Sequence, residues 1–362
     1  MNLNTETMGV GAAGHRLSWV AARNVRRLSL LRKAGLFDGS AGIAQISRAC
    51  KLPDLIEAYR LAYATFLESG YIQPNAWGMR IRAFEACAET ATFLAKKENR
   101  VVGVLSLVLD SQDLGLPSDV CYPRELESLR SKGAKLCEGS NQATLPMFRK
   151  TTVATDLMRC GVAEALSQGC DGIIVTVNPP HCGFYELLGF QKMGDVRSYA
   201  STHYDPVVMM YLDLARFKSR DASLEPYQRF VCDFLSFKNP FVSNVRQWQR
   251  QASECFYDAH LLRTMFVLES DLLETCTDLQ RRAIRRRWGK DLYAQVAGTV
   301  AAETTHAQGG YISEGGRKND NSRHGKRIDA KSRKTPKNLY GQPSILPITS
   351  NSKAKCPSSH IQ

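Results

Sequence analysis

The clearest pattern of apolar and polar positions lies in residues 173–190, which read IIVTVNPPHCGFYELLGF. The apolar, β-branched run at 173–177 is bounded by a glycine and by Asn-Pro-Pro, so a buried strand fits it better than a helix. The two prolines stop strand pairing and force a turn. Residues 184–188 then place their apolar side chains on one face of a helical turn, which Gly189 can end in a left-handed conformation. The segment therefore predicts a strand, a polar loop and a short helix.

The same patterns predict further elements on both sides of this segment. The helix after Pro53 has Asp54 as its expected N-cap, and the polar KKEN turn joins two strands into a hairpin. The order predicts an α/β (α+β) fold with a mixed sheet flanked by helices. The expected elements are strands over 42–50, 92–95, 100–109, 135–144, 173–177 and 207–214, and helices over 55–67, 153–167 and 184–188.

The pattern changes near Phe217. From there to residue 300 it is helical, with large aromatic residues as anchors. Near the other end, residues 16–36 alternate arginines with apolar residues, which fits a basic amphipathic helix or a disordered leader. We therefore divide the chain into four parts. They are a partly disordered basic leader (1–42), an α/β domain (43–216), a helical extension (217–300) and a disordered basic tail (301–362).

The net charge of +13 belongs mainly to the two ends of the chain. Residues 301–362 contain eleven Lys or Arg against four Asp or Glu, and residues 1–50 contain seven against two. Such basic segments commonly meet anionic partners. The sequence shows no long apolar membrane span and no signal-peptide pattern, and its 11 cysteines form no CxxC pair. We expect a cytoplasmic protein, with peripheral contact to the inner membrane left open, and mostly buried cysteines.

Four stretches taken together resemble the FeeM-like N-acyl amino acid synthases, a family of GNAT-fold acyltransferases related to acyl-homoserine-lactone synthases. They are EAYRLAYATFLESGYI at 57–72, VVGVLSLVLDSQDLGLPSDVCYPRELESLRSKGAKLCE at 101–138, the motif at 178–199 and HYDPVVMMYLDL at 203–214. The resemblance extends over roughly residues 43–298. It implies a GNAT-like sheet and transfer of a fatty acyl group from a thioester to an amine.

Two departures from the family pattern matter for the substrates. The glycine-rich diphosphate signature of acetyl-CoA enzymes is missing before Val153, and a helix start without those glycines cradles a diphosphate poorly. The resemblance then implies an acyl-phosphopantetheine donor on acyl carrier protein, with acyl-CoA as the other donor and no tightly bound cofactor. The family commonly has Arg where Ala62 stands, and a different sequence after Glu138.

Three residues are candidates for the chemistry. The amine of an amino acid is mostly protonated at neutral pH, so transfer needs a base. The resemblance favours Glu138 for this role, whereas an exposed strand carboxylate or an ion pair with Lys135 is the structural alternative. Tyr185 can assist the departing sulfur, or it can be a core aromatic. His181 can carry a proton, or it can cap the following helix.

Substrate contacts are expected from the first helix and from the strand that carries Glu138. Arg60 is the candidate for the acceptor carboxylate, since a guanidinium suits that group. Backbone groups near Asn141 to Thr144 are expected to polarise the thioester where parallel strands splay apart. The long loop at 111–129 is a candidate lid. The full set of expected substrate-binding residues is Arg60, Tyr63, Phe66, Tyr71, Asn141, Thr144 and Asn178.

The leading hypothesis is synthesis of N-acyl amino acids from acyl carrier protein thioesters. The acidic carrier can dock on basic surfaces such as Arg281 to Arg287, which otherwise form a solvated helix face. A noncatalytic GNAT-like binding or regulatory module and a signal synthase of the acyl-homoserine-lactone type remain alternatives. Nucleic acid is disfavoured as a partner because no reader motif accompanies the basic tail. No His, Asp or Cys cluster at ligand spacing suggests a metal site.

Overall fold

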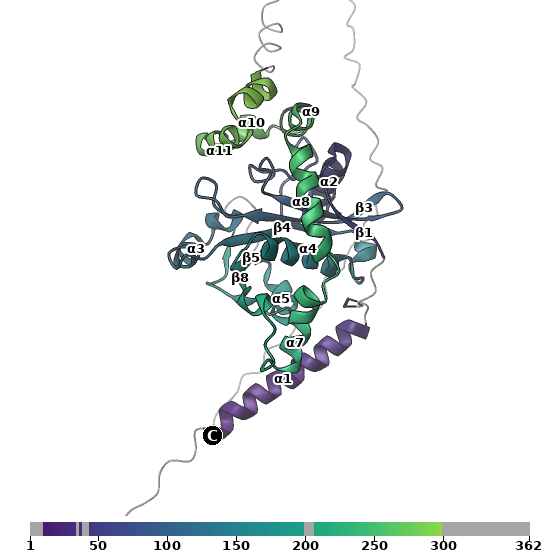
Figure 1. Cartoon of the computed structure of the whole chain (residues 1–362), viewed down its shortest axis with the longest axis vertical. Helices are drawn as coiled ribbons and strands as arrows, with labels where there is room; N and C mark the ends of the chain where they lie inside the picture. The colour runs from purple at the N-terminus through teal and green to yellow at the C-terminus, as the bar shows by residue number, and fades with distance from the viewer. Residues whose placement is uncertain (1–9, 34–35, 38–42, 199–205, 299–362) are drawn as a thin grey trace, which may run out of the picture. The chain divides into compact units, whose positions relative to one another are not determined.

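The computed structural model describes residues 10–33, 36–37, 43–198 and 206–298. Eight strands form a mixed sheet in the order β1-β2-β3-β4-β5-β8-β6, and β7 pairs with β8 (Figure 1). The fourth and fifth strands run parallel, and the other neighbours are antiparallel. The strands are β1 (Gln45–Arg48), β2 (Ala91–Lys97), β3 (Arg100–Leu109), β4 (Leu136–Thr144), β5 (Gly172–Val177), β6 (Gln191–Lys192), β7 (Arg197–Ser198) and β8 (Pro206–Asp213).

Helices cover both faces of the sheet. The α-helices are α1 (Val10–Lys33), α2 (Leu52–Glu68), α3 (Pro123–Arg130), α4 (Val153–Ser167), α5 (Cys182–Leu187), α6 (Ala215–Lys218), α7 (Pro226–Cys232), α8 (Val242–Phe256), α9 (Ala259–Arg263), α10 (Leu272–Thr275) and α11 (Asp278–Trp288). Single turns of 3₁₀-helix are η1 (Pro117–Val120), η2 (Pro146–Phe148) and η3 (Pro179–His181), and π-helical turns are η4 (Asp233–Phe237) and η5 (Thr264–Leu268).

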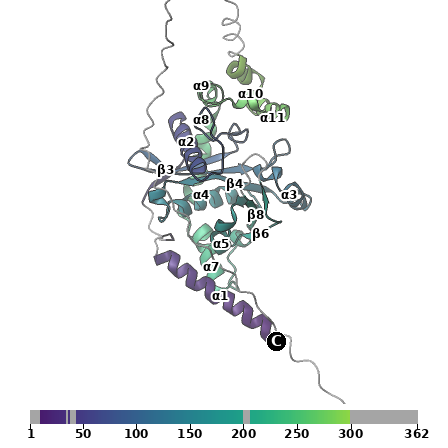
Figure 2. The same ribbon diagram turned by 180° about the vertical axis from the view of Figure 1, so that it is seen from behind.

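The two main helices lie on opposite faces of the sheet (Figure 2). α4 packs against β2 and β3 over a core that contains Phe93, Leu105 and Val175. α2 packs against β3 and β4 on the other face, where alternate strand residues such as Leu94 and Val104 point. Successive side chains of a strand point to opposite faces, and each face of the sheet has its own helix to cover it, so β3 is buried along almost its whole length.

The predicted hairpin is confirmed. β2 and β3 pair from Ala91 with Leu107 to Lys97 with Arg100, and the two turn residues Glu98 and Asn99 both have positive φ, 50° and 62°. Two consecutive positive φ values are the requirement of a tight type I′ turn, whose twist matches that of the strands. The polar turn therefore fixes how β2 and β3 pair next to it.

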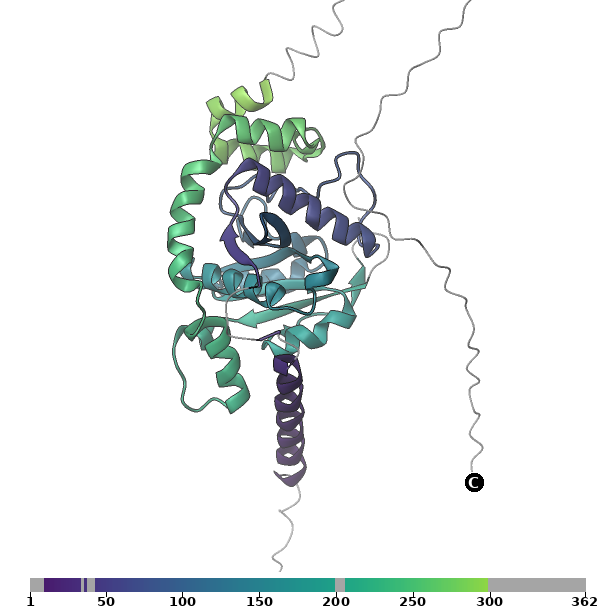
Figure 3. The same ribbon diagram turned by 90° about the vertical axis from the view of Figure 1, so that its right-hand side faces the viewer.

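The helical extension closes the edge of the sheet at β1. α8 contacts both β1 and α4 and runs between α7 and α9 (Figure 3). Phe234 of η4 belongs to the core on the α4 face, whereas Phe266 of η5 and Trp288 of α11 belong to the core on the α2 face. The extension thus contributes aromatic side chains to both cores of the α/β part.

Most predicted elements are present, and the strand, helix and hairpin order is confirmed. The prediction of Asp54 as an N-cap is wrong: α2 begins at Leu52, its N-cap Lys51 makes no side-chain cap bond, and Asp54 accepts from Lys96 at 2.6 Å. The predicted lid at 111–129 contains η1 and most of α3. Arg130 binds both Asp110 and Asp119, and this ties the two ends of the segment together. The predicted tail lies outside the described residues.

The described part of the chain contains neither a candidate metal cluster nor a candidate membrane-spanning helix. No group of three or more His, Cys, Asp or Glu in it could hold a metal ion. No helix in it is long and apolar enough to cross a membrane. Of the nine described cysteines that are free, eight are buried and Cys50 is half-buried, which confirms the expectation for them.

Candidate active site

The parallel strands β4 and β5 separate at one end, as expected from the resemblance. Their register runs from Leu136 with Gly172 to Gly139 with Val175, but β4 continues to Thr144. The register between β3 and β4 also shifts there, and Asn141 has a φ of 51°, which marks a β-bulge. Among the described strands, none pairs with the β5-facing edge of β4 beyond Gly139. This opening leaves backbone donors and acceptors for a ligand.

Glu138 lies on β4 directly before Gly139, the last residue of β4 that pairs with β5. Its side chain points to the α2 face between Val108 and Ile174, and it is only 2% exposed. The backbone N–H and the hydroxyl of Ser118 in η1 both donate to its carboxylate at 2.8 Å. Burial raises the pKa of Glu138 to about 7, and the two bonds from Ser118 oppose this shift. The carboxyl group is therefore close to half-ionised at neutral pH.

Both structural alternatives for Glu138 are wrong. The carboxylate is buried, so it is not an exposed strand residue. Lys135 does not pair with it, because its ammonium group donates to the carbonyl of Gln168 at 2.6 Å, at the start of the strand. A buried carboxyl group with a raised pKa is typical of a general base or acid.

Two arginines and a glutamate converge on the bulge after Glu138. Arg82 donates to Glu85 at 2.6 Å and to the hydroxyl of Ser140 at 3.0 Å. Glu85 is buried and also accepts from the amide of Asn141 at 3.0 Å. Arg80 donates to the amide oxygen of Asn141. The predicted substrate residue Asn141 is thus held from both sides by charged groups.

Sequence reasoning missed Arg80, Arg82 and Glu85 because they lie between predicted elements. The segment MRIRAFE shows no clear helical or strand period, and the sequence analysis predicts neither an element nor a site residue in it. The usable signal was the spacing of the two arginines. Residues two apart in an extended segment point to the same side, which places both guanidinium groups on one surface.

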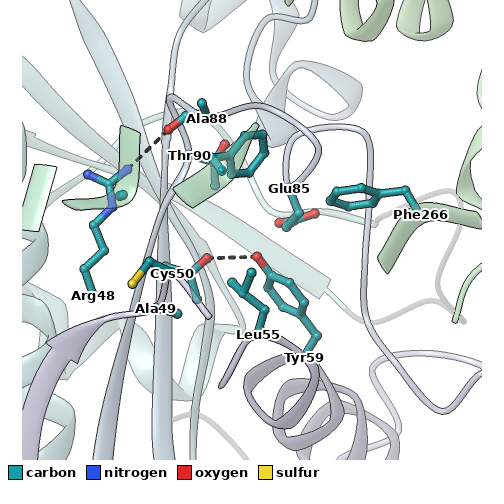
Figure 4. A pocket seen from close by; sticks show the side chains of 12 residues that line it. Arg48, Ala49, Cys50, Leu55, Tyr59, Glu85, Ala88, Thr90 and Phe266 are labelled. Carbon is teal, nitrogen blue, oxygen red and sulfur yellow. Dashed lines mark hydrogen bonds between the residues drawn. The ribbon is translucent and has the colours of Figure 1, made fainter. Parts of the chain in front are cut away.

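A row of hydroxyl groups continues from the bulge across the α2 face. Tyr59 of α2 hydrogen-bonds with Thr92 at 3.0 Å, and Thr92 with Ser106 at 3.2 Å. Ser106 pairs with Ser140 in the sheet register. A pocket of about 20 Å³, enough for one water molecule, borders Tyr59 and Glu85, and Figure 4 shows these two side chains with Phe266 beyond them. The α2 face of the sheet thus carries a continuous polar strip between two apolar clusters.

A larger pocket of about 120 Å³ has a mixed apolar and charged lining that includes two neighbours of Glu138 on the sheet but not Glu138 itself. Val108 and Leu136, which flank Glu138 on the same face, line it together with Phe84 and Leu114. Lys135 and Arg287 contribute basic groups to the lining, and Glu89 and Asp110 contribute acidic ones. The apolar part of this pocket is therefore on the face of the sheet that carries Glu138.

Tyr185 enters the site from the opposite face. Its ring packs in the α4-side core in edge-to-face contacts with Phe184 and Phe190. Its hydroxyl donates to the side-chain oxygen of Gln142 on β4 at 2.8 Å, and burial raises its pKa. Tyr185 thus reaches the separated edge of β4 from α5, although it does not share a face with Glu138.

The remaining polar loop residues lie farther out. His181 is exposed and occupies the expected N-cap position of α5, but its side chain makes no cap bond there. Asn178 donates its side-chain amide to the carbonyl of Pro206 at 3.1 Å, which ties the loop after β5 to β8. Thr144 ends β4 in a buried position, paired with Gly103.

The substrate-binding residues predicted on α2 and in the loop after it lie in different surroundings. Arg60 is half-exposed and pairs with Glu269 of the extension at 3.0 Å, so it lies on the surface rather than at β4. Tyr63 accepts from the backbone N–H of Asn75 at 3.1 Å and supports the loop after α2. Phe66 meets the ring of Tyr71 at 6.0 Å and faces the Arg80 guanidinium at 4.5 Å. Of these residues, Phe66 is the one in contact with the arginine cluster.

The chain was compared with families and solved structures. Residues 57–213 match the family described as N-acyl amino acid synthase FeeM. No curated protein sequence gives a match. The structure of FeeM, an N-acyl amino acid synthase from uncultured soil microbes, is 24% identical, with a TM-score of 0.44, over 49% of this chain and 94% of that one.

Two other solved structures have lower identity. A CoA-dependent acyl-homoserine lactone synthase, BjaI, solved with SAM and isopentyl-CoA, is 16% identical over 53% of this chain and 89% of that one, with a TM-score of 0.38. An N-acetyltransferase from Staphylococcus aureus Mu50 is 16% identical over 48% of this chain and 99% of that one, with a TM-score of 0.37. The family match, which spans α2 to β8, agrees with the observed GNAT-like mixed sheet. The match of residues 57–213 to the N-acyl amino acid synthase FeeM family supports an acyltransferase.

Proposed function

We propose that the chain transfers a long-chain fatty acyl group from an acyl carrier protein thioester to the α-amine of an amino acid, which gives an N-acyl amino acid. The observation that carries this proposal is Glu138: a buried carboxyl group with a pKa of about 7 stands where β4 and β5 begin to separate. The FeeM family match supports the same reaction class. A base with a pKa near the working pH is the most effective one for removing a proton from an ammonium group.

The reaction needs three events at this opening. The ionised Glu138 accepts a proton from the acceptor's ammonium group, and the free amine attacks the thioester carbonyl carbon. Backbone N–H groups on the unpaired edge of β4 stabilise the tetrahedral oxyanion. The carbon–sulfur bond then breaks, and the departing thiolate takes up the second proton that the attacking nitrogen loses, which gives the amide and a free thiol. Tyr185, whose hydroxyl reaches the same edge through Gln142, is the phenol that we propose to assist the sulfur.

The start of α4 supports the choice of the acyl donor. Its first residues, after Thr152, offer none of the glycines that cradle a diphosphate, so the pantetheine of a carrier protein suits the site better than CoA. Carrier proteins are acidic, and Arg282, Arg285 and Arg286 are exposed on α11. We place the acyl chain at the pocket lined by Val108 and Leu136, which neighbour Glu138 on the sheet. No tightly bound cofactor is part of the proposal.

The test is direct. The purified full chain is incubated with acyl carrier protein loaded with fatty acids of several lengths and with a panel of amino acids, and products are identified by mass spectrometry. We expect N-acyl amino acids from the wild type and a loss of about 10²-fold or more in Glu138→Gln, the usual effect of removing a general base. Circular dichroism must show that the variant is folded.

Three outcomes decide between the proposal and its alternatives. A wild type that is inert with both carrier-bound and CoA-bound acyl donors favours a noncatalytic binding module. Cyclised lactone products with S-adenosylmethionine, rather than amino acid products, favour a signal synthase. Full activity in Glu138→Gln would remove Glu138 as the base while leaving the reaction class intact.

A further inference from the structure

The second half of α1 has two sides of different character. Leu28 is 5% exposed and belongs to the core on the α4 face of the sheet, and Leu31 packs against that core. Arg23, Arg26 and Lys33 are exposed. These three residues are three and seven positions apart, so they share one side of the helix, away from the two leucines. The helix therefore buries its apolar stripe and turns a basic side outward.

This outward side, the basic face of α1, consists of Arg23, Arg26, Arg27, Leu30 and Lys33. The four cations are exposed, and Leu30 is 60% exposed between them. Residues 10–33 contain no Asp or Glu, and no ion pair found among the described residues involves any of the four cations. An apolar side chain surrounded by arginine and lysine fits the usual composition of a protein interface, with an apolar centre and a polar rim.

Contacts with α4 and α5 place the basic face in the fold. The carbonyl of Leu36, just after α1, accepts from the hydroxyl of Thr155 in the first turn of α4 at 2.7 Å. A Cβ atom added at Gly183 would lie 3.0 Å from the guanidinium of Arg27, so this arginine lies against α5. α1 thus adjoins both helices.

The same two helices border the open end of the β4–β5 pair. β4 continues through η2 into α4, and β5 continues through η3 into α5. The two strands pair only as far as Gly139 with Val175, and Tyr185 of α5 reaches Gln142 on the open edge of β4. A thioester arm that enters between the separated strands arrives at this end. The basic face of α1 therefore lies beside the entrance.

A second basic helix, α11, adjoins the opposite end of β4. Arg287 of α11 lines the same pocket as Lys135 and Leu136, where β4 begins. Arg286 of the same helix already has an acidic partner, Asp113, at 3.3 Å. Of these two helices, α1 is therefore the one placed at the open end of the strands.

The buried leucines of α1 distinguish between two kinds of anionic partner. A helix that binds a membrane surface places its apolar face among the lipid chains. In α1 the core of the fold already covers that face through Leu28 and Leu31, so the cationic face is the one left for a partner. A cationic face with little apolar area suits an acidic protein surface better than a lipid surface.

We propose that the basic face of α1 docks the acidic surface of the acyl carrier protein and directs its acyl-phosphopantetheine arm into the opening between β4 and β5. This inference rests on the proposed function, and it assigns the docking surface of the donor within it. α1 lies outside residues 57–213, so the family match does not supply this surface.

Direct binding tests the docking surface without any transfer. Fluorescently labelled palmitoyl-acyl carrier protein is titrated with the full chain, and fluorescence anisotropy gives Kd. In Arg23→Glu/Arg26→Glu we expect Kd to rise by about 10-fold or more and to depend less on salt, because attractive contacts become repulsive. The matched control is Arg246→Glu/Arg250→Glu, on the exposed side of α8 at the β1 edge of the sheet, where Kd should change by less than about 2-fold.

Kinetics with two donors separates docking from chemistry. Palmitoyl-pantetheine has the same thioester as the loaded carrier but lacks the protein. Arg23→Glu/Arg26→Glu should raise KM for the carrier-bound donor by about 10-fold or more and change kcat/KM for palmitoyl-pantetheine by less than about 2-fold. Equal losses with both donors would contradict a role in docking.

The remaining outcomes are equally clear. An unchanged Kd in Arg23→Glu/Arg26→Glu, or the selective effect appearing in Arg282→Glu/Arg285→Glu of α11 instead, would overturn the inference. A wild type that does not bind the carrier protein would overturn it too, and binding to phosphatidylglycerol vesicles in its place would assign the face to a lipid surface. Carrier binding that depends on α1 without any acyl transfer would support the docking surface and refute the proposed reaction alone. Urea denaturation checks that each variant is folded.

Discussion

At the residue scale, the chemistry depends on how Ser118 holds Glu138. Burial raises the pKa of this carboxyl group, while the Ser118 hydroxyl at 2.8 Å stabilises its charged form and lowers the pKa. In Ser118→Ala the backbone bond remains but the hydroxyl bond is lost, so the pKa should rise above about 7. A hydrogen bond to a charged group is worth about 1.5 to 3 kcal/mol, which corresponds to about one to two pH units.

The pH dependence of kcat/KM measures this effect. A base works when it is ionised, so activity falls as the pH drops through the pKa of Glu138, and Ser118→Ala should move this acidic limb to higher pH. Ser131→Ala is the control, because that exposed hydroxyl bonds only to the carbonyl of Ser128 at the end of α3. An unchanged limb in Ser118→Ala would contradict the assignment of the titration to Glu138.

At the element scale, the position of α4 depends on a close approach to β3. A Cβ atom added at Gly103 would lie 2.7 Å from a Val153 methyl group and 3.0 Å from a Leu157 methyl group. Gly103→Ala should therefore lower the free energy of unfolding by about 1 to 3 kcal/mol, the usual cost of overpacking. Urea denaturation followed by circular dichroism measures it.

Val153→Ala provides the complementary change for Gly103→Ala. Removing the two methyl groups of Val153 makes room for the added Cβ, so the double variant should be more stable than the sum of the single effects predicts. Strict additivity of the two changes would show that the helix does not meet the strand at this point. The same contact matters for the site, since α4 also packs on β4 and β5 beside their opening.

At the scale of the whole molecule, the extension is joined to the α/β part by Arg287. Its guanidinium binds Asp113 at 2.8 Å and Glu89 at 2.9 Å, and the neighbouring Trp288 donates to the carbonyl of Ala86 at 2.9 Å. Both Arg287 and Asp113 are largely buried, and the hydrogen bond from Arg287 lowers the pKa of Asp113 to about 2. Arg287→Ala should cost about 2 kcal/mol, between the values for exposed and buried ion pairs.

The cost of Arg287→Ala has a defined pH dependence. A carboxyl group with a lowered pKa stabilises the fold above its unfolded pKa of 3.8, and this contribution is lost as the pH falls toward about 2. The difference in unfolding free energy between wild type and variant should be constant above about pH 5 and shrink below pH 4. Arg285→Ala, on the exposed side of α11, should change stability by less than about 0.5 kcal/mol at any pH. A deficit for Arg287→Ala that grows on acidification would contradict the role of Asp113.

The elements that the sequence predicted well are those with a strong local period. The fifteen residues of α4 and the hairpin of β2 and β3 follow from side-chain alternation and turn chemistry alone. Asp54 shows the limit at element ends: proline in the first turn and a bond to Lys96 outweighed its capping preference. Glu138 was also reached from sequence, through its strand and the family resemblance.

The arginine cluster could not be reached in that way. Arg80 and Arg82 lie in a segment without regular structure, and their partners Phe66 and Asn141 come from α2 and β4, far away in the chain. Arg60 was preferred because of its position in the family resemblance and because a guanidinium suits a carboxylate. Its helical face, however, turns toward Glu269 of the extension, which no local pattern reveals.

The sequence by itself determined the order of strands and helices, the presence of the hairpin, the family resemblance and the candidate base. These depend on interactions between residues close in the chain, or on motifs whose order and spacing are visible without folding. Only the tertiary structure decided that Ser118 lies on Glu138, that Tyr185 enters from the other face, and that Arg80 rather than Arg60 reaches β4. The physical reason is that burial, pKa and ion pairing are set by neighbours in space, and the neighbours of these groups come from distant elements of the chain.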